Sequence, residues 1–331
     1  MCLPHIDFLV NRSLEYKSHS CDPDMFADII FRCCWYLYES ERCHEGLPLA
    51  DFALELLRDQ TSLAYAQGTD VFGLLWLNTN RPKKALKCFY ICLRTRERLL
   101  PPNDAFIAVA LNHVSLAYTE LRDFKQAATY QQRAMDIRLK INCPLIDNSY
   151  SNMASILLGL GKLDEAGKMF KRCFSFKDIT AGKEFCADNP RFPGDMMLLS
   201  KIRHFQGKSE ESFRLASRTW TLRQRIFGDK YKTCDPLYQT ADSMSCRDPS
   251  AAVSLLKKSL KLLQKLPESE GFMARAYFKL WELHGKLGSD SETRKRCKEA
   301  ALSYRSQART ELNPGEEYSE QSFGLLVPWK L

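Results

Sequence analysis

The sequence lacks the signatures of a membrane protein and of a disulfide-rich secreted protein. No apolar run approaches the roughly 18 residues of a membrane span, because Asp28 and Arg32 interrupt the nearest stretch, ADIIFRCCWYLY. The 13 cysteines are odd in number and form no C-x-x-C pair, which is typical of reduced thiols. The first residues, MCLPHIDFLV, have no basic start and so do not resemble a secretory signal. We therefore expect a cytoplasmic protein, with the nucleus as an alternative, and no membrane association.

Catalytic and nucleotide-binding motifs are also missing. The sequence contains neither G-x-S-x-G nor H-E-x-x-H, and its six histidines are scattered. Gly207-Lys208-Ser209 matches the end of a phosphate-binding loop, but Ile202 stands where that loop requires its first glycine. The preceding MMLLSKIRHF favours a helix, whereas a phosphate-binding loop follows a strand. We therefore predict a protein that is not an enzyme and does not bind ATP.

The cysteines near residue 34 are the only group that suggests a metal site. This group lacks the paired ligand spacing of a zinc site: Cys33, Cys34, Cys43 and His44. Cys34 also falls at a position that we assign to helix packing. We therefore predict no metal and no cofactor.

Positive charge is what the sequence has in excess, with a formal charge of +8. It gathers in RPKKALKCFYICLRTRER and KIRHFQGKSEESFRLASRTWTLRQR, where basic and apolar residues interleave. This pattern is typical of a solvated helix face, and an acidic partner is the alternative. We do not expect nucleic acid as a partner, since no aromatic-rich RNA-binding motif accompanies the basic residues.

A repeat of 39 to 46 residues runs through most of the chain. Seven segments end in a small residue: Gly46, Ala85, Ala127, Ala166, Ser212, Ala252 and Thr293. Seven residues later the side chain is again small: Ala53, Cys92, Ala134, Cys173, Thr219, Ser259 and Ala300. Twelve residues before each end-point, six of the seven side chains are small: Cys34, Gly73, Ser115, Ala154, Ser200, Thr240 and, as the exception, Trp281. Small residues at fixed offsets predict two helices that cross closely.

The connection between these two helices is predicted to be a short turn. Gly161, Gly207 and Gly288 occupy the same place in it, where a helix end needs a left-handed residue. Gly207 is therefore interpreted as a turn glycine and not as part of a nucleotide site.

The pattern resembles the tetratricopeptide repeat. The best units are ALNHVSLAYTELRDFKQAATYQQRAMDIRLKI and SYSNMASILLGLGKLDEAGKMFKRCF, and their long period is similar to that of kinesin light chains. The end motifs CLPHIDFLV and SFGLLVPWKL are similar to the repeat half of fungal NB-ARC-type NTPase–TPR receptor-like proteins. The resemblance implies an all-α, right-handed superhelical solenoid of about seven helix pairs.

The expected organisation has five parts. Residues 1–25 form an N-terminal cap segment, 26–175 hold repeats 1–4, 176–195 form a loop, 196–305 hold repeats 5–7, and 306–331 form a C-terminal capping tail. The glycines and prolines of KDITAGKEFCADNPRFPGD indicate the loop. The tail carries Phe323, Leu325, Leu326, Val327 and Trp329, and we expect it to cover the open end of the last repeat.

The resemblance also implies a concave groove lined by the first helix of each pair. It places eight residues on that groove: Asn112, His113, Leu116, Ser151, Asn152, Ser155, Lys201 and His204. We expect Asn112, His113 and Asn152 to face solvent. We expect all eight to bind a protein or peptide ligand, and Lys201 and His204 would favour an acidic stretch. The implied function is a protein–protein interaction scaffold. Two alternatives stay open: a regulatory or sensor array that acts with a separate NTPase, and an enzyme or ligand-binding helper in a small-molecule pathway.

Overall fold

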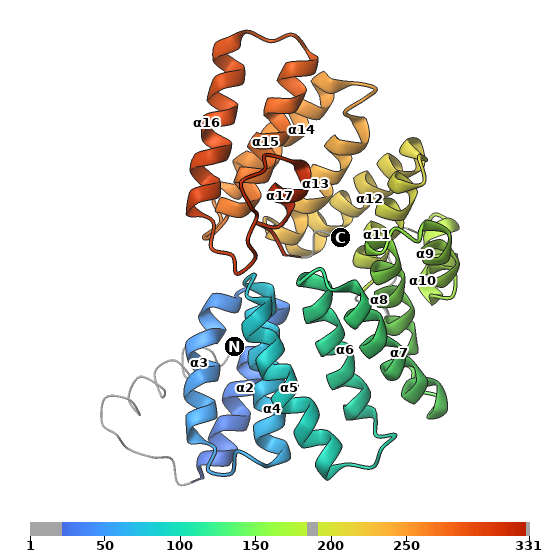
Figure 1. Ribbon diagram of the computed structural model, residues 1–331, viewed down its shortest axis with the longest axis vertical. Coiled ribbons are helices and arrows are strands. Elements are labelled where there is room, and N and C mark those ends of the chain that lie inside the picture. The colour runs from blue at the N-terminus through green and yellow to red at the C-terminus, as the bar shows by residue number, and fades with distance from the viewer. Residues whose placement is uncertain (1–21, 184–190, 329–331) are drawn as a thin grey trace. The chain divides into compact units, whose positions relative to one another are not determined.

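The structure is a computed structural model that describes residues 22–183 and 191–328 (Figure 1). Over these ranges the chain forms 16 helices and no strand. The all-α prediction is therefore confirmed. Residues 1–21 of the predicted N-terminal cap and Trp329 of the predicted tail lie outside the described residues.

The helices alternate along the chain as first and second members of hairpins. The first helices are α2 (Pro23–Glu39), α4 (Leu63–Asn78), α6 (Ala105–Glu120), α8 (Ile146–Gly159), α11 (Phe192–Phe205), α13 (Tyr231–Met244) and α15 (Glu270–Lys286). The second helices are α3 (Cys43–Leu56), α5 (Pro82–Leu99), α7 (Phe124–Lys140), α9 (Leu163–Phe170) with α10 (Phe174–Thr180), α12 (Ser209–Phe227), α14 (Pro249–Leu263) and α16 (Ser291–Gln307). A short helix, α17 (Glu320–Gly324), follows.

The chain divides into two compact units, residues 1–149 and 150–331. In the first unit, Ile30 and Phe31 of α2 pack with Ala50 of α3 and Leu75 of α4 in one apolar cluster. In the second unit, α13, α14 and α15 share a cluster that includes Ala241, Leu256 and Leu283. In both clusters, neighbouring hairpins of the same unit bury their apolar stripes against one another, as expected of a repeat array.

The small-residue register predicted from the sequence is confirmed. All but three of its 21 positions are buried, and the exceptions, Trp281, Thr293 and Ala300, all belong to the last hairpin. The side chain twelve residues before the end-point of a segment can bond to the backbone of the end-point residue. The Ser115 hydroxyl donates to the carbonyl oxygen of Ala127 at 2.8 Å, and that of Ser200 donates to the carbonyl oxygen of Ser212 at 2.8 Å. A larger side chain at either position would push the two helices apart.

The turn between the two helices has the geometry expected from its glycines. Gly207 has φ 75°, and the Lys208 N–H donates to the carbonyl oxygen of Arg203 at 2.9 Å, which closes the end of α11. Gly161 and Gly288 also have positive φ, and Asn80 and Arg122 take the same conformation in the equivalent place. Gly207 therefore ends a helix, as predicted.

Two boundaries differ from the expected ones. Residues 23–25, assigned to the cap segment, belong to α2, because the Asp22 side chain accepts a hydrogen bond from the Met25 N–H and Pro23 fits the first turn. The segment expected to be a loop at 176–195 contains the end of α10 and the start of α11. Phe192 and Ile179 are both buried there. The free energy gained by burying these apolar side chains outweighs the preference of the nearby prolines and glycines for a loop.

Candidate functional site

In the second unit, three successive first helices are joined by charged side chains. Asp235 of α13 lies between Lys201 of α11, 3.4 Å from its Nζ, and Arg275 of α15, 2.8 Å from its guanidinium. Both cations are almost completely buried, with side chains 8% and 3% exposed. Burial alone would raise the pKa of the Asp235 carboxyl, but the charges of Lys201 and Arg275 outweigh burial and hold that pKa well below its usual range.

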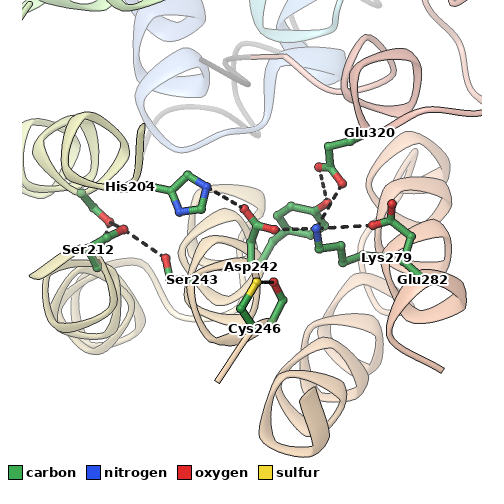
Figure 2. A network of polar contacts seen from close by, with 11 residues as sticks. His204, Ser212, Asp242, Ser243, Cys246, Lys279, Glu282 and Glu320 are labelled. Carbon is green, nitrogen blue, oxygen red and sulfur yellow. Dashed lines mark hydrogen bonds and ion pairs between the residues drawn. The ribbon is translucent and has the colours of Figure 1, made fainter. Parts of the chain in front are cut away.

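A second, more exposed set of charges lies one to two helix turns further along the same helices (Figure 2). The Asp242 carboxylate is 2.6 Å from Lys279 Nζ and 3.4 Å from His204 Nε2. Lys279 also lies 3.4 Å from Glu282. Burial by itself would lower the pKa of Lys279, but the carboxylates of Asp242 and Glu320 more than offset it and raise that pKa. Lys279 is thus a fixed positive charge at any physiological pH.

We call these residues, together with Tyr238, the charged face. Its members come from α11, α13 and α15: Lys201, His204, Asp235, Tyr238, Asp242, Arg275, Lys279 and Glu282. The side chains of His204, Asp242 and Glu282 are 29%, 20% and 34% exposed, so solvent reaches the outer set. The face thus presents donors and acceptors that are held in place by their neighbours, which is the requirement for binding polar groups without a large ordering cost.

Three of the predicted site residues lie in the first unit, on α6. The His113 Nδ1 is 2.7 Å from a carboxylate oxygen of Asp70 on α4, and Asp70 also pairs with Arg96 at 3.2 Å. Asn112 is buried and Leu116 is half-buried. His113 is therefore occupied in joining α4 to α6.

The other five predicted residues lie in the second unit. Ser151 donates a hydrogen bond to Asp195 at 2.7 Å, and Asn152 accepts one from Arg191 at 2.9 Å. Ser155 is half-buried. Lys201 and His204 belong to the charged face described above.

The expectation that Asn112, His113 and Asn152 face solvent is wrong for Asn112 and Asn152, which are 6% and 7% exposed. Ser151 and Lys201 are buried as well. The physical reason is that successive first helices pack closely enough for polar side chains to pair across the contact, which satisfies their hydrogen-bonding capacity. The partners of His113, Ser151, Asn152 and Lys201 are residues that the sequence analysis did not predict for the site: Asp70, Asp195, Arg191 and Asp235.

Within the cysteine group near residue 34, the structure gives Cys34 a packing role. Cys34 is fully buried and its sulfur contacts the carbonyl oxygen of Gly46 at 3.5 Å. Burial raises the pKa of the Cys34 thiol to about 12, so the thiolate that metal binding and nucleophilic chemistry require is not formed. Across residues 22–183 and 191–328, no three His, Cys, Asp or Glu side chains are grouped closely enough to hold a metal ion. No helix in these ranges is both long and apolar enough to cross a bilayer.

Comparison with solved structures places the fold among known helical repeat proteins. The Rap conjugation gene regulator of the plasmid pLS20, in complex with the Phr* peptide, is 14% identical, with a TM-score of 0.64 over 86% of this chain and 73% of that chain. NprR in complex with its cognate peptide NprX is 15% identical, with a TM-score of 0.64 over 92% of this chain and 84% of that chain. BtubC (BKLC) from P. vanneervenii is 15% identical, with a TM-score of 0.53 over 73% of this chain and 95% of that chain.

Sequence comparison identifies the repeat itself. No curated protein matches the chain in sequence. Two family models described as tetratricopeptide repeat match residues 107–142 and 147–178, which cover α6 with α7 and then α8 with α9. These are the two units that the sequence reasoning singled out as the best. Together with the all-helical hairpin array, the matches show that this chain contains tetratricopeptide repeats.

Proposed function

We propose that the chain is a non-catalytic scaffold that binds an extended peptide or a helix of a partner protein on its charged face. The observation that carries this proposal is the outer set of charges on α11, α13 and α15, which is partly exposed and yet held in position. His204, Asp242 and Glu282 each keep a fifth to a third of their side-chain surface open to solvent. A ligand that crosses these helices would meet one such group per hairpin.

The chemistry of the face suits binding better than catalysis. Lys279 has a raised pKa and stays charged, so it is a poor general base or nucleophile near neutral pH. Its partner Asp242 forms an ion pair with Lys279, which makes the Asp242 carboxylate a poor general base for a substrate. Fixed charges of this kind instead fix the register of a bound chain and exclude ligands with the wrong charge pattern.

The fold similarities support a peptide as the ligand. Two proteins of similar fold, the pLS20 Rap regulator and NprR, were solved in complex with peptides. Their sequence identities of 14% and 15% carry no residue-level argument. They do indicate that a hairpin array of this kind can hold a peptide.

The proposal is tested in two steps. The intact chain is used to capture partners, which are identified by mass spectrometry, and the affinity of the strongest one is then measured by isothermal titration. The test variant is His204→Gln with Glu282→Gln, which removes two outer groups and spares the buried Lys201–Asp235–Arg275 set. The matched control is Lys83→Gln with Lys87→Gln, two exposed residues of α5.

We expect the test variant to bind the partner more weakly by about 1–3 kcal/mol, since each hydrogen bond or charge contact contributes roughly 0.5–3 kcal/mol. This loss corresponds to roughly 5- to 150-fold in Kd. The control should keep the affinity of the natural chain. If the control loses affinity and the test variant does not, the partner binds the basic surface of α5 and the proposal is wrong.

A further inference from the structure

The C-terminal segment 310–328 contacts the charged face through Glu320, and this contact reaches a hairpin that a cap on the end of the array would not touch. The Glu320 carboxylate accepts a hydrogen bond from the Tyr238 hydroxyl at 2.5 Å and lies 3.5 Å from Lys279 Nζ (Figure 2). Lys279 belongs to α15 in the last hairpin, but Tyr238 belongs to α13 in the hairpin before it. A segment that only covered the open end of the array would contact the last hairpin alone.

The apolar half of this contact lies three residues further along. Phe323 is 1% exposed, and its ring stacks on Phe278 of α15 with centroids 4.4 Å apart and planes 17° apart. Leu326 follows against Gly271, where an added Cβ would come within 2.1 Å of the Leu326 carbonyl oxygen. A carboxylate and a phenyl ring on one turn of a short helix thus occupy a polar site and an adjoining apolar site.

The rest of the segment is held as a protein holds a bound peptide, through its backbone. Arg305 of α16 donates to the carbonyl oxygens of Gly315 at 2.5 Å, Glu317 at 3.0 Å and Pro314 at 3.3 Å. Such contacts depend little on the side chains of the segment. Among the side chains of the segment, Glu320 supplies the charge and Phe323 the aromatic ring, and Leu326 and Val327 are also buried.

The two groups that contact Glu320 favour a carboxylate at that place. The Lys279 ammonium lies 3.5 Å from the Glu320 carboxylate and stays positively charged, and the Tyr238 hydroxyl donates a hydrogen bond to the same carboxylate.

We propose that the C-terminal segment is an internal competitor, and that the partner peptide presents the same chemistry: a carboxylate followed three residues later by an aromatic ring. This inference rests on the proposed function and names the ligand class for the same face. The segment is tethered, so its effective concentration at the face is in the millimolar range, and a free peptide must compete with it.

The test uses the intact chain and a fluorescent synthetic peptide with the sequence of residues 314–328. Fluorescence anisotropy measures peptide binding to the natural chain and to Phe323→Ala, whose own segment has lost its apolar anchor. Glu320→Gln is a second variant, since that side chain is 37% exposed and outside the core. Glu316→Gln is the matched control, because Glu316 is exposed and lies four residues earlier in the same segment. A control peptide carries Gln at 320 and Ala at 323.

We expect Phe323→Ala to bind the labelled peptide at least tenfold more tightly than the natural chain does. Glu320→Gln should show a smaller gain, and Glu316→Gln should show none. The control peptide should bind none of the chains. Equal binding by the natural chain and Phe323→Ala, or equal binding of the two peptides, would overturn the inference.

A folding defect in Phe323→Ala does not obscure the result. In that case the free peptide should raise the melting temperature of Phe323→Ala towards that of the natural chain, and failure to do so would count against the inference.

The experiments distinguish failure of this inference from failure of the proposed function. If the partner binds the charged face but the segment peptide does not, the scaffold function stands and the competitor is wrong. If the peptide binds but the partner ignores the charged face, the scaffold proposal is wrong.

Discussion

At the scale of single residues, the fold depends on places where two helices come so close that only a small side chain fits. Ala127 and Ala166 are fully buried at the crossing of their hairpins, and the Ser115 hydroxyl bonds directly to the backbone of Ala127. Interiors this dense leave no room for extra methyl groups. The identity of these residues is therefore set by helix separation and not by hydrophobicity.

We predict that Ala127→Leu and Ala166→Leu each destabilise their unit by about 1–3 kcal/mol, the usual cost of overpacking. Ala105→Leu makes the same change at an exposed position in the first turn of α6 and should have little effect. Urea unfolding followed by circular dichroism measures the three variants. Unchanged unfolding of both buried variants would mean that the helix-crossing positions have been misassigned.

We also predict that Gly207→Ala destabilises the turn after α11 by about 1–2 kcal/mol. An added Cβ meets nothing within 4 Å there, so the cost comes from the backbone, whose φ of 75° is unfavourable for alanine. Gly194→Ala, at the start of the same helix, also meets open space but lacks the positive φ and is the control. Equal thermal melts for the two variants would contradict this reading.

At the scale of helices, charged side chains join first helices that are neighbours in space and one repeat apart in sequence. Asp235 connects α11 and α15 through two nearly buried cations. Removing one partner of such a group leaves the others buried and uncompensated, which is costly. The group therefore fixes how α11, α13 and α15 lie along one another.

We predict that Asp235→Asn lowers the free energy of unfolding by about 3–5 kcal/mol at neutral pH. Because the folded-state pKa of Asp235 is depressed below its ordinary value of 3.8, its contribution is complete above that value. The contribution is lost as the pH falls through the folded-state pKa. The difference between the natural chain and Asp235→Asn should thus be constant from about pH 5 to 8 and shrink below about pH 4.

Urea titrations at several pH values measure this difference. Asp51→Asn, an exposed position on α3, is the control and should show a small difference. A difference for Asp235→Asn that did not change with pH in the acidic range would mean that its carboxyl is not stabilised by the two cations.

The helices and their turns could be predicted from the sequence, because small residues and turn glycines recur at fixed offsets. The sequence also predicted correctly that His113, Asn152 and Lys201 lie on the first helices of their hairpins. The partner of His113 was not predicted, although its spacing carried a signal: Asp70 and His113 are 43 residues apart, and a second ion pair, Asp235 with Arg275, is 40 apart. Opposite charges one repeat apart predict pairs between neighbouring hairpins. The hydrogen bond between Tyr238 and Glu320 could not be predicted from spacing. The two residues are 82 apart in sequence, which is not one repeat, and only the fold of the tail brings them together.

At the scale of the whole molecule, the proposed function depends on one surface in the second unit that both the C-terminal segment and a partner would use. The link to a separate NTPase, implied by the fungal resemblance, stays a prediction. Partner binding and release of the segment should then be coupled, because one displaces the other from Tyr238 and Lys279. Coupling of this kind predicts opposite changes in protection at two places in the same chain.

Hydrogen exchange of the intact chain, with and without its captured partner, measures both changes in one experiment. We predict slower exchange in α13 and α15 when the partner is bound, together with faster exchange over residues 310–328. Slower exchange confined to α5 and α7, with α13, α15 and the C-terminal segment unchanged, would contradict binding at the charged face.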